Sequence, residues 1–217
     1  MQICRPRGTW AAFIPKAYAR LGSLVRESEF RDLELKLRLN SDSAGVSRID
    51  FEDGLVIYST LFTYAVGQSG LRVLDLGSAM GYSTLWISKA LEDACSGPCS
   101  VVAVEQKEDR VRAAQDFFKD VKLERVNVSF VQGDAVALLE GVDDESVDAA
   151  FVDVHVSLYP SVAELLVKKL KRSGVAMFHN AIRPPPPADT FQVLLRSGWR
   201  YAVVPTLEGI LVTKRPQ

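Results

Sequence analysis

Apolar and polar residues alternate along this chain in blocks that predict strands and helices in turn. Short apolar runs of buried-strand type are followed by stretches in which apolar residues recur every three to four positions. The strand-like runs lie at 73–76, 100–105, 126–131, 147–152 and 174–178, and the helical stretches near 82–90, 109–121, 134–139, 159–170 and 189–196. This alternation predicts a parallel sheet with helices on both faces and ligands at the carboxyl ends of its strands.

The two ends of the chain depart from this alternation. Helical spacing extends from Ala11 to about Leu39, a loop composition follows at 40–45, and a further helix begins at Asp50 or Phe51. We therefore expect an N-terminal helical cap over 1–45 and a main domain over 46–217, forming one globular unit.

The C-terminal end predicts a hairpin. Pro184–Pro187 cannot continue a helix or strand, so it forms a stiff loop. The runs 199–204 and 210–213 then follow with no helix between them. The expected fold is α/β: a Rossmann-like, mostly parallel seven-stranded sheet with helices on both faces and a C-terminal antiparallel hairpin.

Composition narrows the class of protein. The 217 residues, 47% apolar, suffice for one core. The formal charge of −1 hides basic ends, but the charge alone does not support nucleic-acid binding, and we expect none. Neither an apolar run of about 18 residues nor a signal peptide is visible, so we expect no membrane association and a cytoplasmic location.

Among the three cysteines, Cys95 and Cys99 are close enough in sequence to form a disulfide, but their position beside a loop favours free thiols.

The segment Val73–Ser88 combines a strand, a glycine-bounded turn and a helix. Gly77 and Gly81 allow positive φ and close approach of the backbone to a ligand, beside the amide groups of a helix start. Their G-x-x-x-G spacing differs from the G-x-G-x-x-G of dinucleotide-binding proteins. The segment resembles motif I of class I S-adenosylmethionine-dependent methyltransferases, whose sheets also end in an antiparallel hairpin.

The resemblance implies a binding site for S-adenosylmethionine. Glu105 ends the next strand, where a carboxylate can accept both hydroxyls of a ribose. Asp134 follows the third strand, where this family commonly contacts adenine. The expected cofactor-binding residues are Asp75, Gly77, Ser78, Ala79, Gly81, Tyr82, Ser83, Glu105, Gln106, Gly133, Asp134, Ala135, Asp153 and Tyr159.

The ends of the fourth and fifth strands carry the candidate catalytic residues. They read Phe151-Val-Asp-Val-His-Val-Ser-Leu-Tyr159 and Met177-Phe-His-Asn180, which resemble segments of the catechol and caffeoyl-CoA O-methyltransferase family. The family holds a divalent metal with an aspartate and an Asp-Asn pair. The resemblance thus implies Asp153, His179 and Asn180 as metal ligands, with His179 replacing an aspartate and Val156 replacing a lysine that assists deprotonation.

These replacements leave two versions of the site open. A site with imidazole in place of a carboxylate would hold Mn²⁺, Fe²⁺ or Zn²⁺ better than Mg²⁺. Without metal, His179 is the leading general base, because an ordinary histidine pKa of about 6.5 suits proton transfer near neutral pH. His155, the second of the two histidines, lies at the neighbouring strand end and is a further catalytic candidate.

The predicted function is O-methylation of a small hydroxylated acceptor, and the resemblance also suggests a homodimer. Two alternatives remain: an S-adenosylmethionine-binding protein that has lost catalysis, and an NAD-linked oxidoreductase, which the glycine spacing and the hairpin oppose. A base N-methyltransferase would carry an Asn/Asp-Pro-Pro-Tyr segment after the fourth strand, which this chain lacks there.

Overall fold

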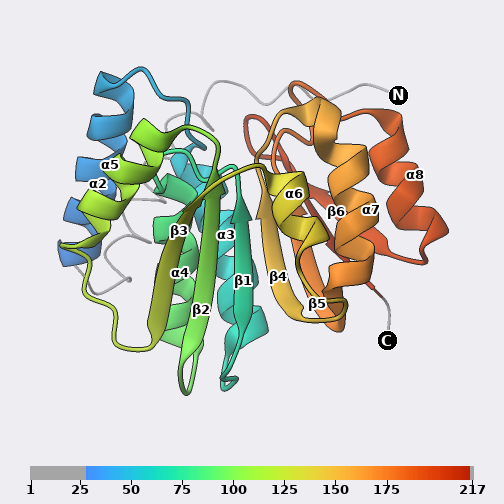
Figure 1. Ribbon diagram of the computed structural model, residues 1–217, viewed down its shortest axis with the longest axis horizontal. Coiled ribbons are helices and arrows are strands. Elements are labelled where there is room, and N and C mark those ends of the chain that lie inside the picture. The colour runs from blue at the N-terminus through green and yellow to red at the C-terminus, as the bar shows by residue number, and fades with distance from the viewer. Residues whose placement is uncertain (1–27, 216–217) are drawn as a thin grey trace, which may run out of the picture.

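The computed structural model describes residues 28–215, and within them seven strands form one central sheet (Figure 1). The strands are β1 (Arg72–Leu76), β2 (Cys99–Glu105), β3 (Val126–Gln132), β4 (Val147–Val152), β5 (Leu170–Phe178), β6 (Arg200–Val204) and β7 (Ile210–Lys214). Their order is β3-β2-β1-β4-β5-β7-β6. The first five strands pair in parallel, and β7 lies antiparallel to both β5 and β6. The predicted fold class is confirmed.

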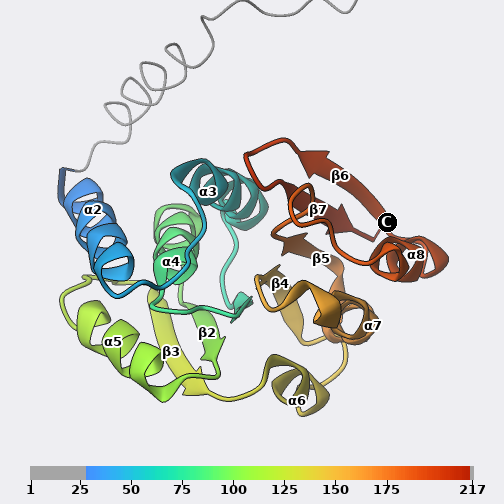
Figure 2. The ribbon, with the colours of Figure 1, turned by 90° about the horizontal axis from the view of Figure 1, so that it is seen from above.

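Helices cover both faces of the sheet, as the view from above shows (Figure 2). They are α2 (Ser28–Ser43), α3 (Phe51–Ala65), α4 (Tyr82–Ala94), α5 (Glu108–Phe118), α6 (Ala135–Glu140), a 3-10 turn η1 (Val156–Leu158), α7 (Tyr159–Lys169) and α8 (Ala188–Arg196). Successive strand residues point to opposite faces. Val73 joins an apolar cluster with α2 to α5, and its neighbour Leu74 joins a second cluster with α6 to α8.

Helix α2 packs onto this core through α4. The ring of Phe30 meets Trp86 edge-on at 5.1 Å, and the Tyr82 hydroxyl donates to Glu34. The Leu37 side chain is buried in the apolar cluster that also contains Val73 of β1. The described part of the predicted cap therefore shares the core of the main domain, while the proposed boundary at residue 45 stays a prediction.

Helix α2 is longer at its C-terminal end than the sequence indicates. Residues 40–43, predicted as loop, are helical, and the Ser41 hydroxyl donates to the Leu37 carbonyl at 3.0 Å. Such back-bonding satisfies the serine within the helix. Gly45, at φ 63°, lies just beyond the helix end. The predicted helical stretch at 11–27 lies outside the described residues.

Strand β5 begins earlier than predicted, at Leu170 directly after α7 rather than at Gly174. Its pairing with β4 shifts between Val147 and Ala149, which marks a bulge. Lys171 binds the Asp148 carboxylate across this bulge at 2.9 Å. The polar residues of the bulge interrupt the apolar pattern, so the sequence predicts only the second half of the strand.

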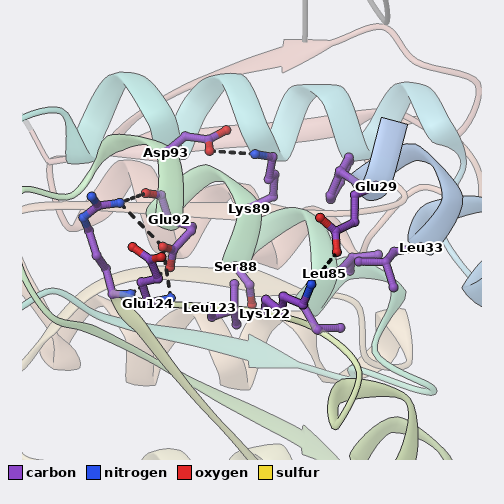
Figure 3. A pocket seen from close by; sticks show the side chains of 13 residues that line it. Glu29, Leu33, Leu85, Ser88, Lys89, Glu92, Asp93, Lys122, Leu123 and Glu124 are labelled. Atoms are coloured by element: carbon purple, nitrogen blue, oxygen red, sulfur yellow. Dashed lines mark hydrogen bonds and ion pairs between the residues drawn. The ribbon is translucent and has the colours of Figure 1, made fainter. Parts of the chain in front are cut away.

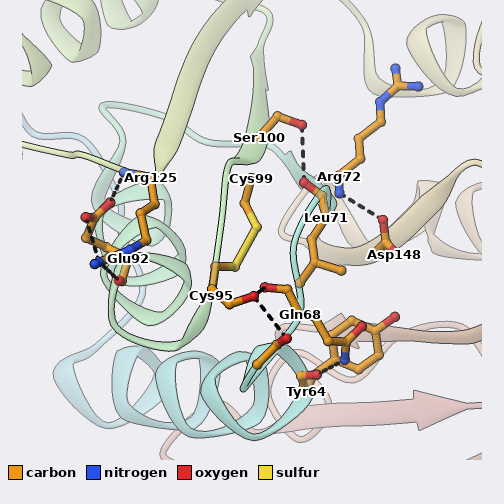
Figure 4. Close-up of a disulfide and its surroundings, with 12 residues drawn as sticks. Tyr64, Gln68, Leu71, Arg72, Glu92, Cys95, Cys99, Ser100, Arg125 and Asp148 are labelled. Carbon is orange, nitrogen blue, oxygen red and sulfur yellow. Dashed lines mark hydrogen bonds and ion pairs between the residues drawn. A yellow bond between two sulfur atoms is a disulfide. The ribbon is translucent and has the colours of Figure 1, made fainter.

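Cys95 and Cys99 form a disulfide, so the prediction of free thiols is wrong (Figure 4). Cys95 caps the end of α4 and Cys99 opens β2, so the bridge closes the turn between these two elements. The turn is also fixed against the α3–β1 loop, because Gly70 donates to Pro98 and the Ser96 hydroxyl to Gly67. The reason is geometric: the tight turn brings the two cysteines together from adjoining elements.

Between residues 28 and 215, each helix is too short or too polar to span a bilayer.

Candidate active site

The strand order reverses between β1 and β4, and the carboxyl ends of these strands lie side by side. Gly77 follows β1 and Asp153 follows β4. The Asp153 amide donates to the Leu76 carbonyl at 2.8 Å. A Cβ on Gly77 would lie 2.3 Å from the Asp153 carbonyl oxygen, and Gly77 has φ 92°. Its lack of a side chain therefore lets two strand ends meet, whereas the sequence indicated room for a ligand. Such a reversal is where ligands bind in open α/β sheets.

A cavity of about 210 Å³ opens at this edge, and we name it the glycine-loop cavity. Its lining includes half of the predicted cofactor-binding residues and His155. The lining residues are Gly77, Val104, Glu105, Gln106, Arg110, Gly133, Asp134, Ala135, Asp153, Val154, His155 and Leu158.

Glu105 is nine-tenths buried at the end of β2 and organises the loop after β1. Its Oε2 accepts the Ala79 amide at 3.1 Å, and its Oε1 accepts the Lys107 amide at 2.9 Å. Arg110 lies 3.9 Å away. Each carboxylate oxygen can accept more than one hydrogen bond, so Glu105 can hold the loop and still accept from a ligand.

Asp134 begins α6 as its N-cap. Its Oδ1 accepts the amides of Val136 and Ala137 at 2.8 and 3.0 Å, while its Oδ2 accepts from the Gln106 side chain at 2.8 Å. The Ala137 amide holds the pKa of this carboxyl below its ordinary value. Gly133 beside it has open space where a Cβ would stand. Asp134 shapes the cavity mainly as a helix cap.

Asp75 and Ser83 lie behind the glycine loop and line neither that cavity nor the second one described below. The Asp75 carboxylate is fully buried and accepts from the hydroxyls of Ser83 and Thr84 at 2.8 and 2.5 Å. Burial raises the pKa of Asp75 to about 7. Both residues therefore join the end of β1 to the first turn of α4, a supporting position that the sequence does not distinguish from a lining one.

The remaining loop residues shape the turn. Ala79 has φ 47°, and Gly81 has φ 90° as the N-cap of α4. A Cβ on Gly81 would lie 3.1 Å from the Phe118 ring. The Ser78 hydroxyl is buried and has no hydrogen-bond partner among the described residues.

The two predicted tyrosines lie outside the glycine-loop cavity. Tyr82 points to Glu34 of α2, whereas Tyr159 is fully buried, with its hydroxyl donating to the Val152 carbonyl at 3.2 Å. Their side chains therefore support the loop and the strand end from within the core.

A second cavity, of about 440 Å³, adjoins the first, and we name it the His179 cavity. Asp153 lines both cavities, so this residue lies at the border between the two spaces. The lining residues are Asp42, Val46, Ser47, Arg48, Asp50, Asp153, His179, Asn180 and Glu208.

The His179 ring is buried among three carboxylates. Its Nδ1 lies 3.1 Å from Asp153 Oδ1, and its Nε2 lies 3.2 Å from Asp53 Oδ2 and 3.4 Å from Glu208 Oε2. Burial alone would lower the pKa of His179, but the hydrogen bonds and charges of Asp153 and Asp53 outweigh it and raise the pKa to about 10. Burial likewise opposes ionisation of Asp53, yet its bond to His179 keeps that pKa below the ordinary value.

This arrangement argues against both versions of the site that the sequence left open. A metal-ligating imidazole needs one nitrogen lone pair, and a general base needs one to accept a proton. Both nitrogens of His179 face carboxylates, and ionised carboxylates only accept hydrogen bonds, so the ring satisfies both by carrying a proton on each nitrogen. Asn180, at φ 55°, donates its side-chain amide to the Arg183 carbonyl at 3.0 Å. Among residues 28–215, no group of three His, Cys, Asp or Glu side chains is placed to hold a metal.

His155 lies apart from His179. It is exposed at the start of η1, where its Nδ1 accepts the Ser157 amide and lies 2.8 Å from the Ser157 hydroxyl. It lines the glycine-loop cavity rather than the His179 cavity. Val156, at the position of the family lysine, packs on the apolar core.

Sequence reasoning missed Asp53, Glu208 and Arg48. Asp53 lies in the first turn of α3, where its Oδ2 accepts the Asp50 amide at 3.0 Å, so its pattern was that of a helix start. Glu208 lies in the turn of the terminal hairpin, and Arg48 precedes α3. The signal that could have indicated Asp53 is a second acid three residues after the N-cap Asp50, on a helix that the fold places against the strand ends.

A third cavity, of about 580 Å³, lies between α2, α4 and the segment before β3 (Figure 3). Two ion pairs join its walls, Lys122 with Glu29 and Arg125 with Glu92, and a third, Lys89 with Asp93, lies along α4. It shares no lining residue with the glycine-loop or His179 cavity.

Comparison with known proteins agrees with this architecture. Residues 74–181 match the family described as a methyltransferase domain. A flavonoid 3',5'-methyltransferase of Vitis vinifera is 26% identical over 117 residues, which cover 51% of this chain and 47% of that protein. A Mycobacterium avium (strain 104) protein with an O-methyltransferase name is 26% identical over 160 residues, covering 67% and 70%. The chain spans about half the length of the other curated relatives it matches.

Solved structures show the same fold at low identity. A methyltransferase from Geobacter sulfurreducens has a TM-score of 0.74 and 20% identity, covering 94% of this chain and 96% of that one. The O-methyltransferase from Bacillus cereus, solved in complex with SAH, has a TM-score of 0.68 and 16% identity, covering 91% and 96%. The match of residues 74–181 to a methyltransferase domain, on a chain with the glycine loop, the strand order and the terminal hairpin described above, assigns the chain to the class I S-adenosylmethionine-dependent methyltransferase family.

Proposed function

We propose that this protein is an S-adenosylmethionine-dependent O-methyltransferase that acts on a small hydroxylated acceptor. The observation that carries the proposal is that one residue, Asp153, lines both the glycine-loop cavity and the His179 cavity. Methyl transfer requires a nucleophile in line with the methyl donor, and two adjoining cavities can hold the two molecules in that relation.

The charges of the glycine-loop cavity suit this cofactor. Its lining carries the carboxylates of Glu105, Asp134 and Asp153 against one cation, Arg110. S-adenosylmethionine, which supplies a methyl group activated on a sulfonium, carries two positive charges and one negative charge. The pyrophosphate of NAD would bring negative charge into the same space, so the lining disfavours an oxidoreductase.

Asp153 is the residue placed to accept the acceptor's proton. His179 holds its Oδ1, while Oδ2 makes no hydrogen bond to another described residue. S-adenosylmethionine, when bound, would supply the methyl group to the acceptor oxygen, and Asp153 Oδ2 would take the proton that this hydroxyl loses. His179 acts through Asp153 as a positioning residue.

The proposal is tested first by ligand-dependent thermal stability. S-adenosylhomocysteine at about a hundredfold excess over Kd should stabilise the protein by about 2.7 kcal/mol, while NAD should leave the Tm unchanged. Stabilisation by NAD alone would reject the cofactor assignment. Transfer of labelled methyl groups to phenolic acceptors would then distinguish an enzyme from a binding protein that has lost catalysis.

Glu105→Ala should weaken binding of S-adenosylhomocysteine by about 1–3 kcal/mol, measured by calorimetry. The change removes a charged acceptor from the cavity and also frees the Ala79 amide, which Glu105 holds. Glu164→Ala, an exposed glutamate of α7, is the matched control and should leave Kd unchanged. Equal affinities in both variants would show that Glu105 plays no part in the site.

A homodimer and a cytoplasmic location remain proposals. The dimer is supported by resemblance to the O-methyltransferase family, and light scattering of the full chain would test it. Fractionation of cells that express the full chain would test the location.

A further inference from the structure

We propose that the His179 side chain, which donates from Nδ1 to Asp153 and from Nε2 to Asp53 and lies beside the Glu208 carboxylate, takes the place of the divalent metal that its family resemblance implies. The site then works without a metal. This inference rests on the proposed function for its meaning in catalysis, but it can be tested on the protein alone.

The geometry around the ring carries the first step. Carboxylate oxygens lie 3.1 Å from Nδ1 and 3.2 and 3.4 Å from Nε2, and only about 3% of the His179 side chain is exposed. Three carboxylates around a small volume need a positive charge, because unpaired buried charges are costly. The ring lies between them, so it can supply that charge and at the same time fill the volume.

The second step concerns the ligands left for a metal. Asp153 Oδ1 and Asp53 Oδ2 already accept from His179, and Asp53 Oδ2 also accepts the Asp50 amide. The side-chain nitrogen of Asn180 is bonded to the Arg183 carbonyl. Among the described residues, Asp153 Oδ2 and Asp53 Oδ1 are left without a hydrogen bond, but a divalent cation bound to them would lie beside the positively charged ring.

The third step follows from the single residue that differs. In the related family the position of His179 is an aspartate, next to the asparagine that Asn180 matches. Aspartate at 179 would remove the cation and add a fourth carboxylate beside Asp53, Asp153 and Glu208. Oxygen-rich sites of this kind suit Mg²⁺, Ca²⁺ and Mn²⁺.

The test compares the wild-type protein with His179→Asp. Each protein is dialysed against Mg²⁺ or Mn²⁺ and then against buffer, its bound metal is measured by elemental analysis, and its Tm is recorded with Mn²⁺ and with EDTA. We expect no retained metal and no Tm shift for the wild type. We expect about one Mn²⁺ per chain and a Tm rise that EDTA reverses for His179→Asp.

His155→Asp is the matched control, because it makes the same substitution at the exposed histidine outside the cluster. It should gain no metal. The inference is overturned if the wild type retains about one metal per chain and Asp153→Asn abolishes it, or if His179→Asp is folded and binds no more metal than His155→Asp. Should His179→Asp fail to fold, the wild-type measurement with Asp153→Asn still decides.

The same samples separate this inference from the proposed function. Stabilisation by S-adenosylhomocysteine is measured beside metal binding. If S-adenosylhomocysteine does not stabilise the wild-type protein, the cofactor assignment is rejected and the metal result still stands. If the wild type binds a metal, the inference is rejected and the cofactor assignment still stands.

Discussion

Asp153→Asn is expected to lower the rate of methyl transfer by about 10²–10⁴-fold, the usual contribution of a positioned base. Asparagine keeps the size of the side chain and an acceptor oxygen for the His179 ring, but it cannot take a proton from the acceptor hydroxyl. Asp153 lines both cavities, and because asparagine keeps the size of the side chain, the change should affect kcat more than the Kd of S-adenosylhomocysteine. Transfer of labelled methyl groups to the best phenolic acceptor of the wild type measures the effect.

Asp143→Asn provides the control for this substitution. Asp143 is exposed in the loop before β4, at the opposite end of that strand from Asp153. Its variant should keep wild-type kcat. An unchanged kcat in Asp153→Asn, with phenolic turnover intact, would move the proton transfer to another group, and Glu208 in the same cavity would be the next to change.

The fold could be predicted well because its signals are local. Strand β4 is six consecutive buried residues, and a glycine turn separates β1 from α4. Both features depend on neighbours in the chain. The bulge in β5 could not be predicted in the same way, since the contact of Lys171 with Asp148 depends on how two strands pair.

The candidate site was predictable only where a strand ends. Glu105 and Asp153 reach the glycine-loop cavity because parallel strands place their carboxyl ends at one edge. Asp53 reaches His179 from 126 positions away in the sequence. Such contacts arise from the packing of α3 against the sheet, which the spacing of residues does not encode. The sequence therefore indicated a histidine at the strand end but not the carboxylates that set its chemistry.

His179→Asn is expected to destabilise the protein by about 3–5 kcal/mol near neutral pH, the usual cost of removing one partner from a buried ion pair. The carboxylates of Asp53, Asp153 and Glu208 would then face one another with only Arg48 as a cation lining the same cavity. Urea unfolding of the two proteins, compared at equal slope, measures the difference in free energy.

The same substitution should change how stability depends on pH. The pKa of His179 is raised from an unfolded value of about 6.5 to about 10 in the folded protein. Its contribution is therefore fully present below pH of about 6.5 and is lost as pH rises through that interval, with a slope approaching about 1.4 kcal/mol per pH unit. The pKa of Asp53 is lowered, so its contribution is instead lost on acidification below the ordinary carboxyl range.

The contribution of His179 is isolated by subtracting the unfolding free energy of His179→Asn from that of the wild type at each pH. The lysines and tyrosines that titrate near pH 10 are common to both proteins, so their effect cancels. The difference should shrink between about pH 6.5 and 10. His155→Asn, at the exposed histidine outside the carboxylate cluster, is the matched control and should change the unfolding free energy far less than His179→Asn. A wild-type minus His179→Asn difference that is flat above neutral pH would mean that the ring is neutral in the folded protein, with one of the facing carboxyls holding the proton instead.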